Sequence, residues 1–168
     1  MFKTALSEFP ILRRAALADK SVETFGAVTL ESVKEATVLH VLGKPGNAPP
    51  AVPQGFDARS AGPGQWFVVG SADQDLPIFD DSFFIVDQSH GRVLIRISGA
   101  PVRKVLAKGT ALDLHPDQFA IGAGATTLIG HIAVNLSRTG EDQFELLVLR
   151  GFAESLWHEL EVMSAEFA

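Results

Sequence analysis

The fold is decided by the stretch VDQSHGRVLIRISGAPVRKVLAKGTALDLHP, residues 86–116. In its first part every second residue is apolar and β-branched, which predicts a strand with one buried face. The buried residues of this strand would be Val93, Ile95 and Ile97. After a turn at residues 98–101 the apolar residues recur at helical spacing, at Val102, Val105 and Leu106. The stretch therefore predicts a strand, a turn and a short helix in direct succession.

Three residues mark the ends of that helix. The hydroxyl of Ser98 can accept a hydrogen bond from an unpaired amide, and Pro101 suits a first helical turn, so Ser98 is predicted as the helix cap. Gly109 follows the last apolar residue, where a left-handed C-cap belongs. A phosphate site at this turn is not indicated, because the chain contains neither G-x-G-x-x-G after the strand nor G-x-x-x-x-G-K-[ST].

The composition is that of an ordinary globular chain of 168 residues, 46% hydrophobic and 20% charged, which predicts one domain with an extra arm. The net charge of −6 argues against nucleic acid as a partner, since phosphate binding needs clustered Lys and Arg. No run of 18 apolar residues occurs, so we expect no membrane span. The absence of cysteine excludes disulfides, thiolate metal sites and cysteine nucleophiles.

We expect residues 1–24 to form an N-terminal arm and residues 25–168 a single α+β domain. Apolar residues of the arm recur at helical spacing, at Leu6, Phe9, Leu12 and Ala16. This pattern predicts a short amphipathic helix or a partly ordered arm that docks on its own core or on another subunit. Charged residues interrupt the apolar runs of residues 1–20, so this segment does not read as a secretion signal and we expect a cytoplasmic protein.

Short apolar runs predict further strands over residues 25–30, 37–42, 66–69 and 83–86. Residues 43–64 contain five prolines and are predicted as a long, stiff surface loop. Residues 71–81 contain four aspartates but lack the glycine and the closing glutamate of a calcium loop, so a solvated loop is expected. His90-Gly91-Arg92 is predicted to turn a hairpin into the central strand.

The C-terminal part predicts two more strands and the longest helix. Alternation over residues 126–138 indicates one long strand bent at Gly130, and residues 144–149 would pair with it after a turn. A helix is predicted over residues 152–163, with an apolar stripe of Phe152, Leu156, Leu160 and Met163. The elements together predict an α+β fold: an antiparallel or mixed sheet, helices mainly on one face, and a ferredoxin-like strand–helix–strand–strand–helix core.

The chemistry-bearing residues form no convincing catalytic or metal constellation. His158 has Glu154 and Glu161 at helical neighbour positions, but H-E-x-x-H is absent, so a structural or solvent-exposed histidine is expected rather than a ligand. Asp113 and His115 are two residues apart, and side chains two apart on an extended chain would need a bend to meet as an acid–base pair. No serine stands in a G-x-S-x-G elbow. We therefore expect no catalytic residue, no metal site and no cofactor site in this chain.

Several stretches together resemble one known family. Residues 86–116, F-x-x-G at residues 119–122, TTLIGHIAVNLSR at 126–138 and DQFELLVLRGFAESLWHEL at 142–160 are similar to the gamma subunit of heterotetrameric sarcosine oxidase. GPGQWFVVG at residues 62–70 resembles a glycine-proline-x-x-tryptophan strand of the same family. ISGAPVRKVLAKGTALDLHP is the most specific part of the likeness, which covers roughly residues 28–161.

The resemblance implies a role inside a larger enzyme. That complex oxidises the N-methyl group of sarcosine to give glycine, with FAD, FMN and NAD on its larger subunits and tetrahydrofolate as one-carbon acceptor. The family is similar in turn to the N-terminal part of aminomethyltransferase, the folate-binding T-protein. Where those relatives carry a Thr/Ser-Asn-Asp-like segment, this chain retains only Asp113, which makes Asp113 the candidate remnant of a folate pocket.

The leading hypothesis is a non-catalytic assembly subunit that binds the larger subunits of a sarcosine oxidase-type complex. Its interface would be the N-terminal arm, with the loop over residues 43–64 as a second contact. One alternative is a stand-alone module that binds a folate-like small molecule near Asp113. Another is a scaffold for a different flavin amine oxidase.

Overall fold

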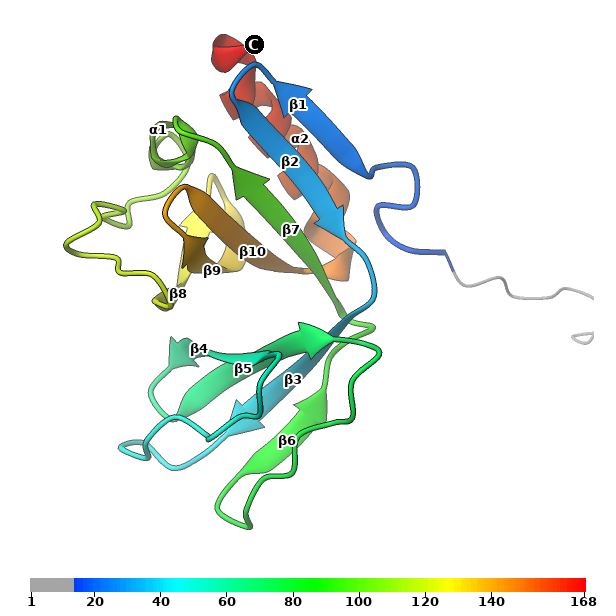
Figure 1. The fold of residues 1–168 in the computed structure, drawn as a ribbon, viewed down its shortest axis with the longest axis vertical. Coiled ribbons are helices and arrows are strands. Elements are labelled where there is room, and N and C mark those ends of the chain that lie inside the picture. The colour runs from blue at the N-terminus through cyan, green and yellow to red at the C-terminus, as the bar shows by residue number, and fades with distance from the viewer. Residues whose placement is uncertain (1–13) are drawn as a thin grey trace, which may run out of the picture.

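The computed structural model describes residues 14–168, which form two antiparallel sheets with helices against the larger one (Figure 1). The six-stranded sheet has the order β1-β2-β7-β10-β9-β8, and the four-stranded sheet has the order β4-β5-β3-β6. The strands of the larger sheet are β1 (Val22–Phe25), β2 (Val28–Val33), β7 (Arg92–Ser98), β8 (Gly124–Ile129), β9 (Ile132–Gly140) and β10 (Gln143–Leu149). Those of the smaller sheet are β3 (Ala36–Leu42), β4 (Phe56–Gly62), β5 (Gln65–Ser71) and β6 (Phe84–Asp87).

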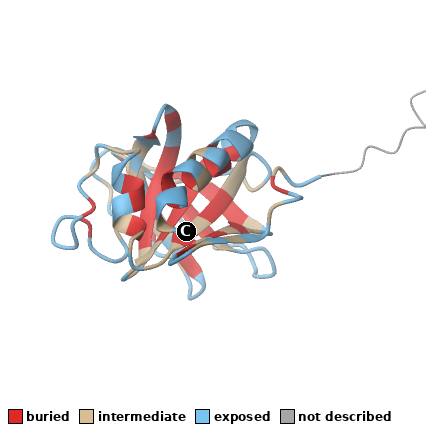
Figure 2. Cartoon of the chain, turned by 90° about the horizontal axis from the view of Figure 1, so that it is seen from above, coloured by how far each residue is buried: buried red, intermediate tan, exposed pale blue. Residues whose placement is uncertain are grey.

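Two helices cover one face of the six-stranded sheet and bury the main core. They are α1 (Val102–Ala107) and α2 (Ala153–Ser164), with short 3-10 turns η2 (Arg150–Phe152) and η3 (Ala165–Phe167) flanking α2. Figure 2 shows the buried residues on the strands beneath the helices and on the inner faces of the helices themselves. The predicted α+β class, with antiparallel strands and helices on one face, is confirmed. The second sheet was not predicted.

The central strand β7 lies between β2 and β10, and its predicted inner residues Ile95 and Ile97 are fully buried against the helices. The opposite face was expected to be open to solvent, but Leu94 on that face is also buried. Leu94 packs in a second cluster that joins the two sheets, with Val38, Phe67, Val69 and Leu147. The smaller sheet therefore covers part of the face that the helices leave free.

The predicted caps of the short helix are both wrong. Ser98 remains in the strand ladder opposite Gln143 and makes no cap; α1 begins after Pro101 without a side-chain cap. The turn between β7 and α1 depends instead on Gly99, which has a φ of +123°. A Cβ atom at this position would lie 1.8 Å from the carbonyl oxygen of Ala27. At the other end the C-cap is Lys108 in helical conformation, and Gly109 leaves room for Ile129 and Met163.

Four of the predicted strand boundaries and turns need correction. The expected strand over residues 25–30 is a hairpin of β1 and β2, turned at Gly26 with φ +54°. Part of the predicted loop over residues 43–64 is strand β4, which pairs with β5. His90-Gly91-Arg92 is a turn but not a hairpin, because β6 pairs with β3 and β7 pairs with β2 and β10 in the other sheet.

The fourth correction concerns residues 126–138, which reverse direction at Gly130 and form the β8–β9 hairpin. Gly130 has φ +58°, a conformation that favours glycine. Of the two residues before the turn, Ile129 is buried and Leu128 is exposed.

Helix α2 confirms Leu156, Leu160 and Met163 as buried residues. Phe152 lies before the helix and is exposed, and its predicted place in the stripe is taken by Ala153 and Trp157. The helix therefore presents a wider apolar face than its predicted stripe, because the residues that pack under it lie on both sides of Leu156 and Leu160.

The inner end of the predicted arm packs against the domain, while Leu6, Phe9 and Leu12 lie outside the described residues. Leu17 is buried in the main core, and Lys20 forms an ion pair of 2.6 Å with Glu161 on α2. None of the helices over residues 14–168 is long and apolar enough to cross a membrane.

Candidate functional site

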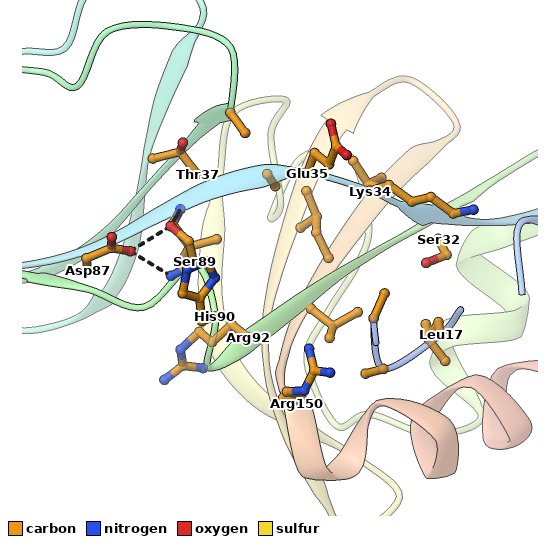
Figure 3. Close-up of a pocket in the computed structure, with 18 of the residues that line it drawn as sticks. Leu17, Ser32, Lys34, Glu35, Thr37, Asp87, Ser89, His90, Arg92 and Arg150 are labelled. Atoms are coloured by element: carbon orange, nitrogen blue, oxygen red, sulfur yellow. Dashed lines mark hydrogen bonds between the residues drawn. The ribbon is translucent and has the colours of Figure 1, made fainter. Parts of the chain in front are cut away.

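The two sheets are joined where β2 continues directly into β3. Only Lys34 and Glu35 separate the two strands, and Glu35 has a φ of +58°, which is unusual for a residue other than glycine. The sharp turn lets one continuous segment contribute a strand to each sheet. A cavity of about 560 Å³ opens beside this connection, and Figure 3 shows side chains of β2, β3, β7 and the 87–92 turn gathered around it.

The 87–92 turn is tied down by its own hydrogen bonds. Ser89 donates from its amide and its hydroxyl to Asp87 Oδ1, at 2.9 and 2.6 Å, and these hydrogen bonds lower the pKa of Asp87. The same hydroxyl accepts the amide of Val38 on β3 at 3.0 Å. The segment that connects β6 to β7 is therefore fixed to the smaller sheet.

Arg92 stands at the end of this turn with a preset orientation. Its Nε donates to Gln88 Oε1 at 2.5 Å, and its guanidinium lies 4.3 Å from the ring centroid of Phe67. Partial burial lowers its pKa, because a desolvated guanidinium is less favourable when charged. Arg92 lines the cavity, and no carboxylate of residues 14–168 forms an ion pair with it.

A buried ion network lies on another side of the same connection. Glu145 on β10 binds Arg59 of β4 at 2.5 Å and Arg96 of β7 at 2.8 Å, and Arg96 also binds Glu31 of β2. Arg59 and Glu145 are each only 4% exposed. Since β4 belongs to the smaller sheet and the others to the larger one, this network holds the two sheets at a fixed distance.

Polar contacts between β4 and the β8–β9 hairpin support the same joint. Asn135 donates to the carbonyl of Ser60 at 2.7 Å, and Thr126 donates to the carbonyl of Ala61 at 2.9 Å. Nε and Nη1 of Arg59 are buried and have no hydrogen-bond partner within residues 14–168. The charge of Glu145 is therefore the main compensation for this guanidinium.

The residues singled out from the sequence lie apart from this joint. Asp113 is exposed in the segment between α1 and β8, and its Oδ1 accepts the amide of His115 at 2.9 Å in a local turn. It does not line the cavity between the sheets. His115 itself is exposed and caps the amide of Asp117.

His158 is exposed to solvent on α2. Its Nδ1 lies 3.4 Å from Glu161 Oε2, and the other oxygen of Glu161 is taken by Lys20 and Trp157. Over residues 14–168 no three His, Asp or Glu side chains are grouped closely enough to hold a metal ion. His40 is partly buried against Phe67, and burial lowers its pKa.

An exposed apolar edge forms the second candidate surface. Strand β6 is the last strand of the smaller sheet, pairs only with β3 within residues 14–168, and is exposed along its whole length. We call the exposed apolar residues of β6 and of the segment before it the β6 patch: Leu76, Ile78, Phe84, Ile85 and Val86. Ile78 is 96% and Phe84 77% exposed, so these large side chains face solvent rather than the core.

Sequence reasoning missed the cavity, the ion network and the β6 patch. The run Phe83 to Val86 was predicted as a strand, and β6 occupies nearly the same residues, but its exposure was not predicted. The cavity and the network could not be found locally, because their residues come from strands that are neighbours only in the folded sheets. The one local signal is charge: Arg96 and Glu145 are charged residues within predicted strands, whereas Arg59 lies in the segment predicted as a loop.

The described residues thus form a small α+β domain with an exposed edge strand. Residues 71–166, more than half of the chain, match the sarcosine oxidase, gamma subunit family. The chain belongs to this family.

Curated relatives carry the same description. "Sarcosine oxidase subunit gamma" of Corynebacterium sp. (strain P-1) is 35% identical over 89 residues, or 53% of this chain and 44% of that protein. The protein of the same description from Corynebacterium sp. (strain U-96) is 33% identical over 84 residues, 50% of this chain and 41% of its own length. The chain thus aligns with less than half the length of these two relatives. The subunit from Arthrobacter sp. is 29% identical over 198 positions, covering all of this chain and 98% of that protein.

Solved structures share the fold. A chain of the heterotetrameric sarcosine oxidase from Corynebacterium sp. U-96, solved in complex with pyrrole 2-carboxylate, superposes with a TM-score of 0.75 at 25% identity. The superposition covers 92% of this chain and 96% of that one. Aminomethyltransferase T of the glycine cleavage system from Bartonella henselae superposes with a TM-score of 0.56 at 15% identity, over 82% of this chain and 46% of that chain. The T-protein-like fold expected from the sequence is confirmed.

Proposed function

We propose that this chain is a non-catalytic assembly subunit of a heterotetrameric sarcosine oxidase-type complex. The oxidative demethylation of sarcosine, with FAD, FMN, NAD and tetrahydrofolate, would take place on the larger subunits, in the cytoplasm. Membership of the gamma subunit family supports the proposal, as does the likeness to a chain of a heterotetrameric oxidase. The observation that carries it is the β6 patch, because its exposed apolar side chains would be buried by contact with a partner chain.

The physical reason is that β6 combines an unpaired strand edge with exposed apolar side chains. An edge strand leaves a row of amide and carbonyl groups unpaired, and β6 adds large exposed apolar side chains to that row. Proteins normally protect such edges with charges, bulges or a covering element. An edge that is both apolar and open is favourable for an added strand or an apolar surface of another chain.

The test is co-purification of the tagged chain with co-expressed larger sarcosine oxidase subunits. Phe84→Glu combined with Val86→Glu places two charges on one face of β6, and recovery of the larger subunits should fall at least about tenfold. Leu128→Glu is the matched control, because Leu128 is also an exposed apolar strand residue but lies on β8. Undiminished recovery with the β6 variant, together with an unchanged melting temperature, would refute β6 as the docking edge.

The arm predicted from the sequence is tested in the same assay. Leu17 and Lys20 contact the domain, so the informative deletion removes residues 1–13 and leaves those contacts in place. A tenfold loss of recovery on this deletion would assign the N-terminal segment to the interface as well. Full recovery would leave the β6 patch as the main contact.

The non-catalytic part of the proposal has its own measurement. The purified chain alone should show no flavin absorbance and no turnover of sarcosine. Either signal would contradict it. The alternative of a folate-like ligand at Asp113 gains no support from the site, because the Asp113 carboxylate is exposed and used in a local turn.

A further inference from the structure

Three cations meet at one end of the larger sheet. Lys34 follows the last residue of β2, Arg92 is the first residue of β7, and Arg150 follows the last residue of β10. These strands are neighbours in the order β2-β7-β10, and β7 runs antiparallel to both. The end of β2, the start of β7 and the end of β10 therefore coincide, and all three side chains line the 560 Å³ cavity (Figure 3).

The charge of this cavity is opposite to that of the whole chain. Its lining contains four Lys or Arg residues against two acidic residues, although the chain carries a net charge of −6. Arg14 is paired with Asp19, but Lys34, Arg92 and Arg150 form no ion pair with any of residues 14–168. Of the two acidic residues, Asp87 is already bound by Ser89.

The two guanidiniums are positioned by contacts that leave terminal nitrogens available. Arg92 is held through Nε by Gln88 and through its planar face by Phe67, so both of its terminal nitrogens lack a partner within the described part of the chain. Arg150 is adjacent, because its amide donates to the carbonyl of Gly91 at 2.8 Å and its Nη2 donates to the carbonyl of Arg14. Fixed guanidinium groups favour carboxylate and phosphate ligands, which accept two parallel hydrogen bonds.

A serine hydroxyl and several apolar side chains also line the cavity. Ser32 is 9% exposed, lines the cavity, and has no hydrogen-bond partner for its hydroxyl in residues 14–168. Apolar walls come from Leu17, Val33, Val93 and Leu94. A volume of about 560 Å³ lies within the range of pockets that enclose small organic ligands.

We propose that this cavity binds a compact organic polyanion, with carboxylate or phosphate groups on Lys34, Arg92 and Arg150 and its carbon skeleton against the apolar wall. A small anion satisfies three cations that form no ion pair within the described residues. The chain's own first 13 residues are a poor match, because they contain Lys3 and Arg13 against the single acidic residue Glu8. The proposal does not depend on the assembly function.

The experiment is a titration of the full-length ¹⁵N-labelled chain, followed by amide chemical shifts. Citrate represents the carboxylate source and inorganic pyrophosphate the phosphate source. At least one should give saturable shifts centred on residues 32–34, 90–93 and 150, with a dissociation constant below about 1 mM. The anion that binds more tightly identifies which of the two chemistries the site prefers.

Variants separate a built site from general attraction to positive charge. Lys34→Gln and Arg150→Gln change exposed residues, so they should fold normally, and each should weaken binding about tenfold, as expected for a lost charge-assisted hydrogen bond. Lys104→Gln is the control, since it removes one exposed positive charge from α1, outside the cavity lining. The proposal is overturned if neither anion binds at about 10 mM, if the shifts lie elsewhere, or if Lys104→Gln weakens binding as much as Arg150→Gln.

Discussion

Glu161 is the side chain that connects the N-terminal end of the domain to α2. One carboxylate oxygen accepts Lys20 at 2.6 Å and the indole N–H of Trp157 at 2.7 Å. Partial burial acts to raise the pKa of Glu161, but the hydrogen bonds, foremost that from Lys20, outweigh it and lower the pKa to about 2. The carboxylate is therefore bound more favourably in its charged form when the protein is folded.

This pKa shift gives a stability contribution with a defined pH window. Because the folded pKa is depressed, the contribution is fully present above the ordinary value of 4.5 and is lost as the pH falls from there towards about 2. Glu161→Gln should lower the melting temperature at pH 7, and the difference from the unchanged protein should shrink across that window. Glu159→Gln on the same helix is the control. A difference that stays constant from pH 7 to pH 2 would contradict the assignment.

Glu145 is the residue on which the joint between the sheets depends most. Among residues 14–168, its substitution would leave the buried Arg59 guanidinium with Asp57, at 3.8 Å, as its one countercharge. Removing one partner of a buried pair typically costs about 3–5 kcal/mol, so Glu145→Ala should strongly lower the free energy of unfolding measured by urea denaturation. Asp142→Ala breaks the more exposed pair with Arg103 and should cost less than about 1 kcal/mol. Equal effects of the two substitutions would show that the network is not the joint.

At the scale of elements, α2 provides the largest part of the helix contribution to the core. Leu156 and Leu160 are fully buried on this helix, and Val162 on the same helix is 59% exposed. Leu156→Asp or Leu160→Asp should unfold the domain, because an unpaired buried charge costs several kcal/mol, comparable to a small domain's whole stability. Val162→Asp should leave the circular dichroism spectrum and melting temperature nearly unchanged. A normal melting temperature for Leu156→Asp would place that face outside the core.

The elements also show which parts of the fold can be read from local sequence. Local patterns identified β7, β10 and α2, although β10 buries residues on both of its faces. Periodicity failed at residues 126–138, where an alternating pattern continues through the Gly130 turn and only the φ of +58° shows the reversal. Ser98 failed as a cap because ladder pairing with Gln143 and Thr29 keeps it in the strand.

The candidate sites were harder to predict than the elements because they depend on topology. Strand β4 was hidden inside a proline-rich segment, and without it neither the second sheet nor the buried Arg59 can be expected. Lys34, Arg92 and Arg150 are far apart in the sequence and become neighbours only through the strand order. The family resemblance supplied what these local patterns did not, namely membership of the sarcosine oxidase, gamma subunit family.

At the scale of the whole molecule, the two sheets have different roles. The larger sheet carries the helices and the main core, whereas the smaller sheet presents its edge strand β6 to solvent. The cavity and the ion network lie at the junction of the two sheets. Leu76 belongs to the β6 patch and also lines the cavity. A partner that covers the β6 patch would therefore also contact one wall of the proposed anion site. Assembly would therefore bury the most apolar exposed strand of the domain.

Hydrogen–deuterium exchange tests this account most directly, comparing the chain alone with the chain assembled with larger sarcosine oxidase subunits. Burial of the β6 patch by a partner should slow exchange in residues 76–87 by at least about tenfold, while the β8–β9 hairpin turn at Gly130 exchanges at the same rate in both states. Assembly that protects other segments and leaves residues 76–87 unchanged would contradict the central claim that this chain docks through β6.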